Sequence, residues 1–209
     1  MSATAVVVER ASACEHAVGR LLHRTAIARR AGGFFIAMNL QSDDFELFGV
    51  PRRFAQDRDA LDARWKDLQR EAHPDRFAAQ GAAAQRVAMQ WSVRINEAYQ
   101  RLKDPLKRAA YLCELGGSPI RAEDNTAMPA AFLMQQMEWR EALDEARSAA
   151  ELDALDDTTH MARQVALARC AELLDQQQDY AGAAREVRAL MFIARFAHDI
   201  DLRREQLGQ

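Results

Sequence analysis

Two segments of the sequence repeat apolar residues every three or four positions, and a proline separates them. This spacing places the apolar side chains of each segment on one face of an α-helix. Because proline disfavours helical backbone in the residue before it, the first helix must end close to Pro74. The sequence therefore predicts two antiparallel helices, over residues 57–72 and 84–103, joined by a loop. The facing stripes are Leu61, Trp65, Leu68 and Ala72 on the first helix and Val87, Trp91, Ile95, Ala98 and Leu102 on the second.

The rest of the chain is also typical of helical proteins. Its 209 residues include only 9 Gly and 5 Pro, and no proline follows Pro129. We expect a short helix over residues 44–48 and three longer ones over residues 130–150, 152–178 and 180–207. Three helices of that length can close a core of their own. The predicted fold is all-α, an N-terminal helical hairpin followed by a C-terminal three-helix bundle.

Glycine and proline between Gly116 and Pro129 predict a boundary between two domains. We place the first domain at residues 38–116, a linker at 117–129 and the bundle at 130–207. Residues 1–37 are rich in arginine and alanine, and we expect a disordered extension or a start assigned too early. A mitochondrial presequence is the alternative, but Glu9 and Glu15 count against it.

Charge and cysteine spacing exclude several classes of function. A net charge of -3 argues against a nucleic-acid partner, and no apolar run approaches the roughly 20 residues that span a bilayer. Cys14, Cys113 and Cys170 lie too far apart in sequence for a zinc or redox motif, so we expect no metal and no cofactor. Reduced cysteines and a bias of 25 Arg to 3 Lys favour a bacterial cytoplasm.

The loop between the paired helices carries His73-Pro74-Asp75, here called the tripeptide. Downstream, residues 95–102 read Ile-Asn-Glu-Ala-Tyr-Gln-Arg-Leu, and Asp104-Pro105 follows. Together these features resemble a J-domain, which activates the ATPase of DnaK-type chaperones. The segments Phe45-Glu46-Leu47-Phe48-Gly49 and Ala131-Phe132-Leu133-Met134 are similar, more narrowly, to HscB, the J-protein family of iron-sulfur cluster assembly. The resemblance covers residues 38 to about 207.

The resemblance implies a co-chaperone that is not an enzyme. Its tripeptide would engage the DnaK-like chaperone HscA and stimulate ATP hydrolysis there. Its C-terminal bundle would bind the cluster scaffold IscU and deliver it to the chaperone. We expect the chain to act as a monomer, with no catalytic residue of its own.

The residues around the tripeptide fit contact with a chaperone. Pro74 fixes the backbone and limits the entropy lost on docking, while His73 and Asp75 offer directional polar contacts. Lys66 and Arg70 lie one turn apart, away from the apolar stripe, where they can meet an acidic partner. Arg76, where J-domains usually have lysine, is assigned no contact.

The helix expected at residues 130–150 carries apolar residues on two sides. Phe132, Trp139 and Leu143 face the bundle core on one side. The other side begins apolar and ends acidic, which favours a basic partner that also buries apolar surface. In the HscB family the matching positions bind the scaffold, and Phe192 matches a further contact. We call the second side the apolar–acidic strip: Leu133, Met134, Met137, Glu138, Glu141 and Glu145.

Two other functions compete with this interpretation. A general J-protein would serve a DnaK-type chaperone with other clients, but the chain lacks the Gly/Phe-rich linker and zinc repeats of such proteins. A hydrolase would use His73 and Asp75, but no Ser or Cys stands near them in sequence as a nucleophile.

Overall fold

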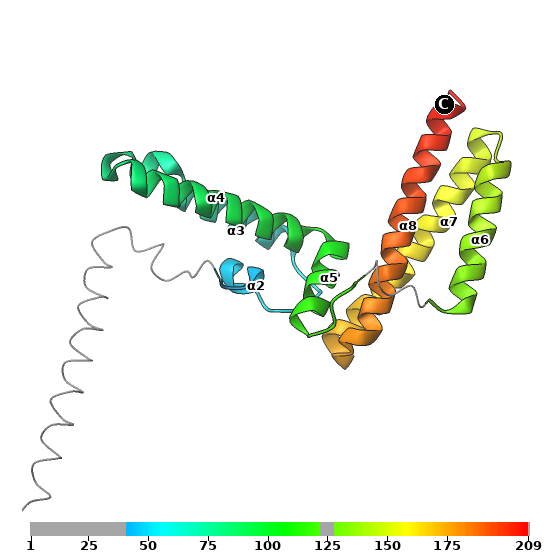
Figure 1. The fold of residues 1–209 in the computed structure, drawn as a ribbon, viewed down its shortest axis with the longest axis horizontal. Coiled ribbons are helices and arrows are strands. Elements are labelled where there is room, and N and C mark those ends of the chain that lie inside the picture. Colours follow the sequence, from blue (N-terminus) through cyan, green and yellow to red (C-terminus); the bar gives the residue numbers. More distant parts are fainter. Residues whose placement is uncertain (1–40, 122–127, 209) are drawn as a thin grey trace, which may run out of the picture. The chain divides into compact units, whose positions relative to one another are not determined.

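The computed structural model describes residues 41–121 and 128–208. Every helix described below belongs to one compact unit, which begins at Asp44. The described residues form helices and no strand, so the predicted all-α fold is confirmed (Figure 1). The expectation for residues 1–37 lies outside the described residues, as does part of the predicted linker.

The predicted hairpin consists of α3 (Arg58–Glu71) and α4 (Ala82–Lys103), preceded by the short α2 (Asp44–Phe48). Asp57 caps α3, because its carboxylate accepts the backbone N–H groups of Asp59 and Ala60. The connection between the two helices is more regular than a loop, since it contains the 3₁₀-helix η1 (Pro74–Gln80).

Side-chain hydrogen bonds set the register of α3 against α4. The Trp65 indole N–H donates to the side-chain oxygen of Asn96 at 2.9 Å, and the Tyr99 hydroxyl donates to Asp62 at 2.7 Å. The rings of Trp65 and Tyr99 stack with centroids 4.8 Å apart. Asp62 pairs with Tyr99, and Trp65, three residues later on α3, pairs with Asn96, three residues earlier on α4. The two helices are therefore antiparallel.

The apolar stripe of α4 differs from the prediction at its first position. Val87 is 44% exposed, whereas Ala88 is fully buried. The buried stripe thus steps back three residues from Trp91 rather than four, and both spacings suit a helix of 3.6 residues per turn. The other predicted members of the stripe, Trp91, Ile95, Ala98 and Leu102, are buried.

A further helix, α5 (Pro105–Leu115), was not predicted. Asp104 caps it by accepting two backbone N–H groups, and Pro105 occupies its first turn, where a missing N–H costs little. Leu112 and Cys113 are buried on this helix, which packs against α4 and against the last helix of the chain.

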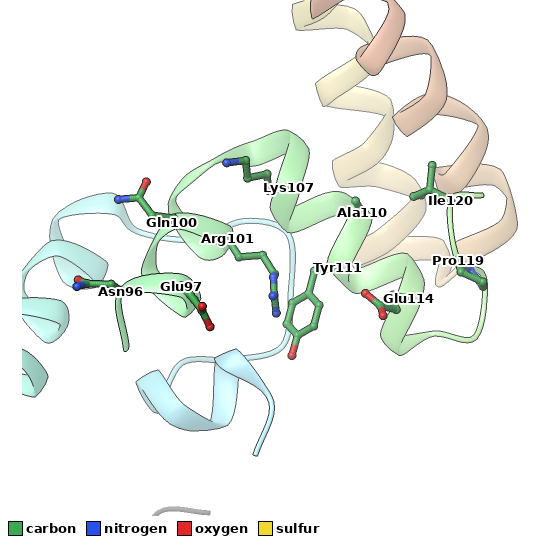
Figure 2. A pocket seen from close by; sticks show the side chains of 10 residues that line it. All are labelled: Asn96, Glu97, Gln100, Arg101, Lys107, Ala110, Tyr111, Glu114, Pro119 and Ile120. Atoms are coloured by element: carbon green, nitrogen blue, oxygen red, sulfur yellow. The ribbon is translucent and has the colours of Figure 1, made fainter. Parts of the chain in front are cut away.

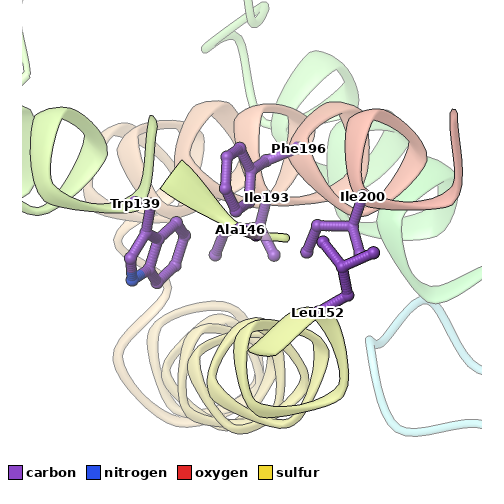
Figure 3. Close-up of a cluster of buried hydrophobic side chains, with 6 residues drawn as sticks. All are labelled: Trp139, Ala146, Leu152, Ile193, Phe196 and Ile200. Carbon is purple, nitrogen blue, oxygen red and sulfur yellow. The ribbon is translucent and has the colours of Figure 1, made fainter. Parts of the chain in front are cut away.

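The predicted bundle consists of α6 (Ala130–Glu145), α7 (Ala149–Ala171) and α8 (Tyr180–Gln206). Helix α7 begins three residues earlier than expected, because the Ser148 side chain and Glu151 form a capping box at its start. It continues into a π-helical turn, η2 (Glu172–Gln177). All three helices contribute to one buried cluster (Figure 3): Trp139, Ala146, Leu152, Ile193, Phe196 and Ile200.

Candidate functional site

The tripeptide lies where α3 ends and η1 begins. His73 has an extended backbone, and its Nδ1 atom accepts the backbone N–H of Asp75 at 3.3 Å. In the neutral ring this leaves the proton on Nε2. The side chains of His73 and Asp75 are 59% and 88% exposed, so both are accessible to a partner. The Nδ1 atom of His73 lies 3.7 Å from an Asp75 carboxylate oxygen.

The backbone on both sides of the tripeptide is tied down. The Ser92 hydroxyl on α4 donates to the carbonyl of Ala72 at 3.2 Å. The Arg76 guanidinium donates to the carbonyl of Arg70 at 3.3 Å, and Phe77 is buried against the hairpin. The exposed side chains therefore stand on a fixed backbone, which lowers the entropy lost when they bind.

The two predicted basic residues of α3 are both exposed. Arg70 pairs with Asp67 at 3.1 Å, but both side chains are more than half exposed, so this ion pair is weak. Lys66 lies one turn before Arg70 on the same helix face. An acidic partner can thus bind both cations without breaking a buried contact.

The apolar–acidic strip occupies the exposed face of α6. Its apolar members Leu133, Met134 and Met137 are 45%, 63% and 62% exposed, which confirms that they lie outside the bundle core. The opposite face packs inward through Trp139, which is buried, and through Phe132 and Leu143, which are partly buried. The carboxylates of the strip, Glu138, Glu141 and Glu145, are exposed as well.

Phe192 occupies a position between surface and core. Its ring lies 5.7 Å from that of Phe132, edge to face, and 6.4 Å from that of Trp139. It also stacks on Phe196 at 6.2 Å, while the Arg140 guanidinium lies 5.9 Å above it. Phe192 is partly buried against the core cluster, so less of its side chain is accessible than in the exposed residues of the strip.

Comparison with known proteins places the chain in a family. The family model described as the HSCB C-terminal oligomerisation domain matches residues 128–201. A protein of Burkholderia thailandensis named co-chaperone protein HscB homolog is 51% identical over 173 residues, which is 81% of this chain and 98% of the relative. The chain belongs to the HscB co-chaperone family. A Bordetella avium HscB homolog is 50% identical over 159 residues, 76% of this chain and 95% of its own length.

Solved structures of HscB proteins share the fold. Chaperone HscB from Vibrio cholerae is 36% identical, with a TM-score of 0.68 over 79% of this chain and 99% of that one. Human co-chaperone protein HscB is 26% identical, with a TM-score of 0.75 over 80% and 84% of the two chains. The fold and the family interpretation of the sequence are therefore confirmed, while the roles of individual site residues stay predictions.

The sequence did not predict the contacts that join the segment before α3 and helix α5 to the C-terminal bundle. Asp175 on η2 accepts the backbone N–H groups of Phe54 and Ala55 at 2.6 and 2.8 Å. Buried Arg108 on α5 lies 5.1 Å over the ring of Phe54 and donates to the carbonyl of Leu102. Burial lowers the pKa of Arg108, and nearby Asp104 and Asp175 oppose that shift.

A second missed cluster anchors α2. The Asp44 carboxylate is fully buried and pairs with Arg94 at 2.6 Å and Arg101 at 2.9 Å. The backbone N–H of Asp44 donates to the Tyr111 hydroxyl at 3.0 Å. These contacts hold α2 against α4 and α5. Their sequence separations, up to 67 residues, leave no local pattern from which to predict them.

A groove of about 780 Å³ lies between α4, α5 and the residues that follow α5 (Figure 2). Its lining mixes acidic Glu97 and Glu114 with basic Arg101 and Lys107. Neither the tripeptide nor the strip lines it. The predicted binding residues thus lie on exposed surfaces rather than in this groove.

Residues 41–121 and 128–208 contain no group of three or more side chains suited to hold a metal ion. Burial raises the pKa of the Cys113 thiol to about 11 and that of Cys170 to about 12, so both are protonated at neutral pH. Within the same part of the chain, no helix has the length and hydropathy to cross a membrane.

Proposed function

We propose that the chain is a co-chaperone of iron-sulfur cluster assembly in a bacterial cytoplasm. It stimulates the ATPase of the DnaK-like chaperone HscA and delivers the scaffold IscU to it. The observation that carries the proposal is the exposed tripeptide on a fixed backbone, in a chain that also has a separate exposed apolar surface. The bacterial relatives of the same family support it.

The tripeptide supplies the contact with HscA. His73 and Asp75 make polar bonds to the ATPase domain, and their fixed backbone keeps the ordering cost low. Lys66 and Arg70 attract an acidic surface on HscA and set the orientation of docking. Hydrolysis takes place on HscA, so the chain needs no catalytic residue and no cofactor of its own.

The apolar–acidic strip supplies the contact with IscU. Leu133, Met134 and Met137 bury apolar surface on binding, and flexible methionine adapts to the shape of the client. The carboxylates Glu138, Glu141 and Glu145 favour a basic client surface and reject acidic ones. Phe192 contributes through the part of its ring that the aromatic cluster leaves uncovered.

The proposed division of labour assigns residues 38–116 to the J-domain, 117–129 to the linker and 130–207 to the scaffold-binding bundle. The chain acts as a monomer between its two partners. The matching family model is described as an oligomerisation domain. Light scattering on the purified protein, alone and with IscU, measures whether it associates with itself or only with its client.

Steady-state ATP hydrolysis with purified HscA and IscU, each component omitted in turn, tests the function. We expect stimulation that requires this chain and rises further with IscU. His73→Gln should abolish stimulation and leave IscU affinity within about twofold, because distant sites act independently. His198→Gln, an exposed histidine on α8, is the matched control. Full stimulation by His73→Gln contradicts the proposal, as does ATP turnover by the chain alone.

A further inference from the structure

A second groove opens at the acidic end of the strip, between α6 and α7. It has a volume of about 450 Å³ and lies beside the turn that joins the two helices. Alanines at 142, 146 and 154 line it, and their small side chains leave the space open. Leu155, which packs against the bundle core, adds an apolar surface to the same groove.

Two carboxylates lie at this groove, one from each helix. Glu145 is the last residue of the strip, and Glu151 belongs to the first turn of α7. One Glu151 carboxylate oxygen accepts the backbone N–H groups of Arg147 and Ser148, at 2.8 and 3.0 Å. The bond from Arg147 is the main reason that the pKa of Glu151 is below its usual value. Two hydrogen bonds therefore hold the Glu151 carboxylate in position and favour its ionised form.

The groove continues the strip. Glu145 belongs to both, and Ala142 follows Glu141 directly. From Leu133 to Glu145 the strip runs twelve residues along α6, about 18 Å at the helical rise. A client segment that lies along the strip from its apolar end would reach the groove with its next residues.

The chemistry of the groove matches one kind of side chain. The aliphatic stem of a lysine or arginine can lie on alanine and leucine while its charged end stays near carboxylate and water. A carboxylate already held in position loses little entropy on binding that cation. An acidic side chain would meet Glu145 and Glu151 with like charge.

We propose that the groove between α6 and α7 is a second part of the client surface and takes a basic side chain of the scaffold. This inference rests on the proposed function, since the scaffold must first bind the strip. It makes Glu151 and Ala154 on α7 contact residues, in addition to those of α6.

Two substitutions in the full chain test the groove by titration calorimetry with purified IscU. Glu151→Gln removes the charge, but the amide oxygen of glutamine can still accept the backbone N–H groups of Arg147 and Ser148 at the start of α7. We expect affinity about threefold lower and a shallower dependence on salt. Glu205→Gln, an exposed carboxylate on α8, is the matched control and should bind like the wild type.

Ala154→Phe fills the groove and should weaken IscU binding at least about tenfold, because the ring occupies the place of the client side chain. Ala194→Phe, at an exposed alanine of α8, is its control. Circular dichroism monitors folding of each variant. If Ala154→Phe does not fold, the affinity and salt dependence of Glu151→Gln decide alone.

A third variant separates this inference from the function on which it rests. Met134→Ala acts on the strip and not on the groove. Loss of affinity with Met134→Ala, but none with Glu151→Gln or Ala154→Phe, overturns the groove and leaves the proposed function standing. Unchanged affinity in all three variants overturns both.

Discussion

The tripeptide and the apolar–acidic strip present their side chains in different ways. Around the tripeptide, hydrogen bonds from Ser92 and Arg76 fix the backbone, and the exposed groups are few and polar. Along the strip, one regular helix supplies the backbone, and exposed apolar side chains over about one turn are followed by exposed carboxylates. Binding by the tripeptide should depend on the fixed position of its backbone, whereas binding by the strip should depend on which side chains its helix face carries. Substitutions in the two regions should therefore differ in what they disturb.

The largest effect is expected beneath the strip rather than on it. Trp139→Ala removes a buried indole from the bundle cluster and should lower the free energy of unfolding by about 3–5 kcal/mol. Urea denaturation followed by circular dichroism measures it. A loss below about 1 kcal/mol would mean that the core does not depend on this ring.

On the strip itself, Met134→Ala should lower IscU affinity about tenfold, as expected for an anchor in a binding surface. Its side chain is 63% exposed, so the melting temperature should change little. Calorimetric titration and thermal denaturation together check this. Met161→Ala, equally exposed on α7, should leave IscU affinity unaltered. A large loss of stability in Met134→Ala would instead show a structural role.

Near the tripeptide, Ser92→Ala removes the hydroxyl that donates to the Ala72 carbonyl. One lost hydrogen bond should cost about 1 kcal/mol of stability. It should also weaken ATPase stimulation, since the backbone before the tripeptide loses its tie to α4. IscU affinity should stay the same. Undiminished stimulation at saturating chaperone would contradict the importance that we give to a fixed backbone.

The smallest effect concerns the exposed cations of α3. Lys66→Ala should raise the concentration needed for half-maximal ATPase stimulation about twofold at low salt, and less in concentrated salt. Lys107→Ala, an exposed lysine on α5, serves as the comparison. Equal effects of both substitutions would mean that net charge matters and position does not.

The features that the sequence predicted were those set by local periodicity. The buried face of α3 and the exposed face of α6 follow from 3.6 residues per turn, so the exposure of Met134 and Met137 was predictable. Two further local signals mark helix starts that the apolar periodicity did not predict. Asp104-Pro105 is typical of a helix start, as is Ser148 with Glu151 three residues later, and these mark the starts of α5 and α7.

Other contacts had no local signal at all. Asp175 binds a backbone segment 121 residues earlier in the sequence, and a lone aspartate near a helix end does not reveal its partner. Buried Asp44 with Arg94 and Arg101 is similar, because one stretch of chain supplies the acid and another supplies the bases. The partial burial of Phe192 likewise depends on ring packing between α6 and α8.

The π-helical turn η2 has a consequence for how this chain tolerates insertions and deletions. A π-helical turn contains one residue more than the equivalent α-helical turn, and Asp175 lies within it. Deleting one residue there would restore a regular helix, and the side chains within the turn would change direction while those before and after it kept theirs. The Asp175 carboxylate would then no longer face the N–H groups of Phe54 and Ala55. The chain length of η2 is thus constrained by a loop more than a hundred residues away.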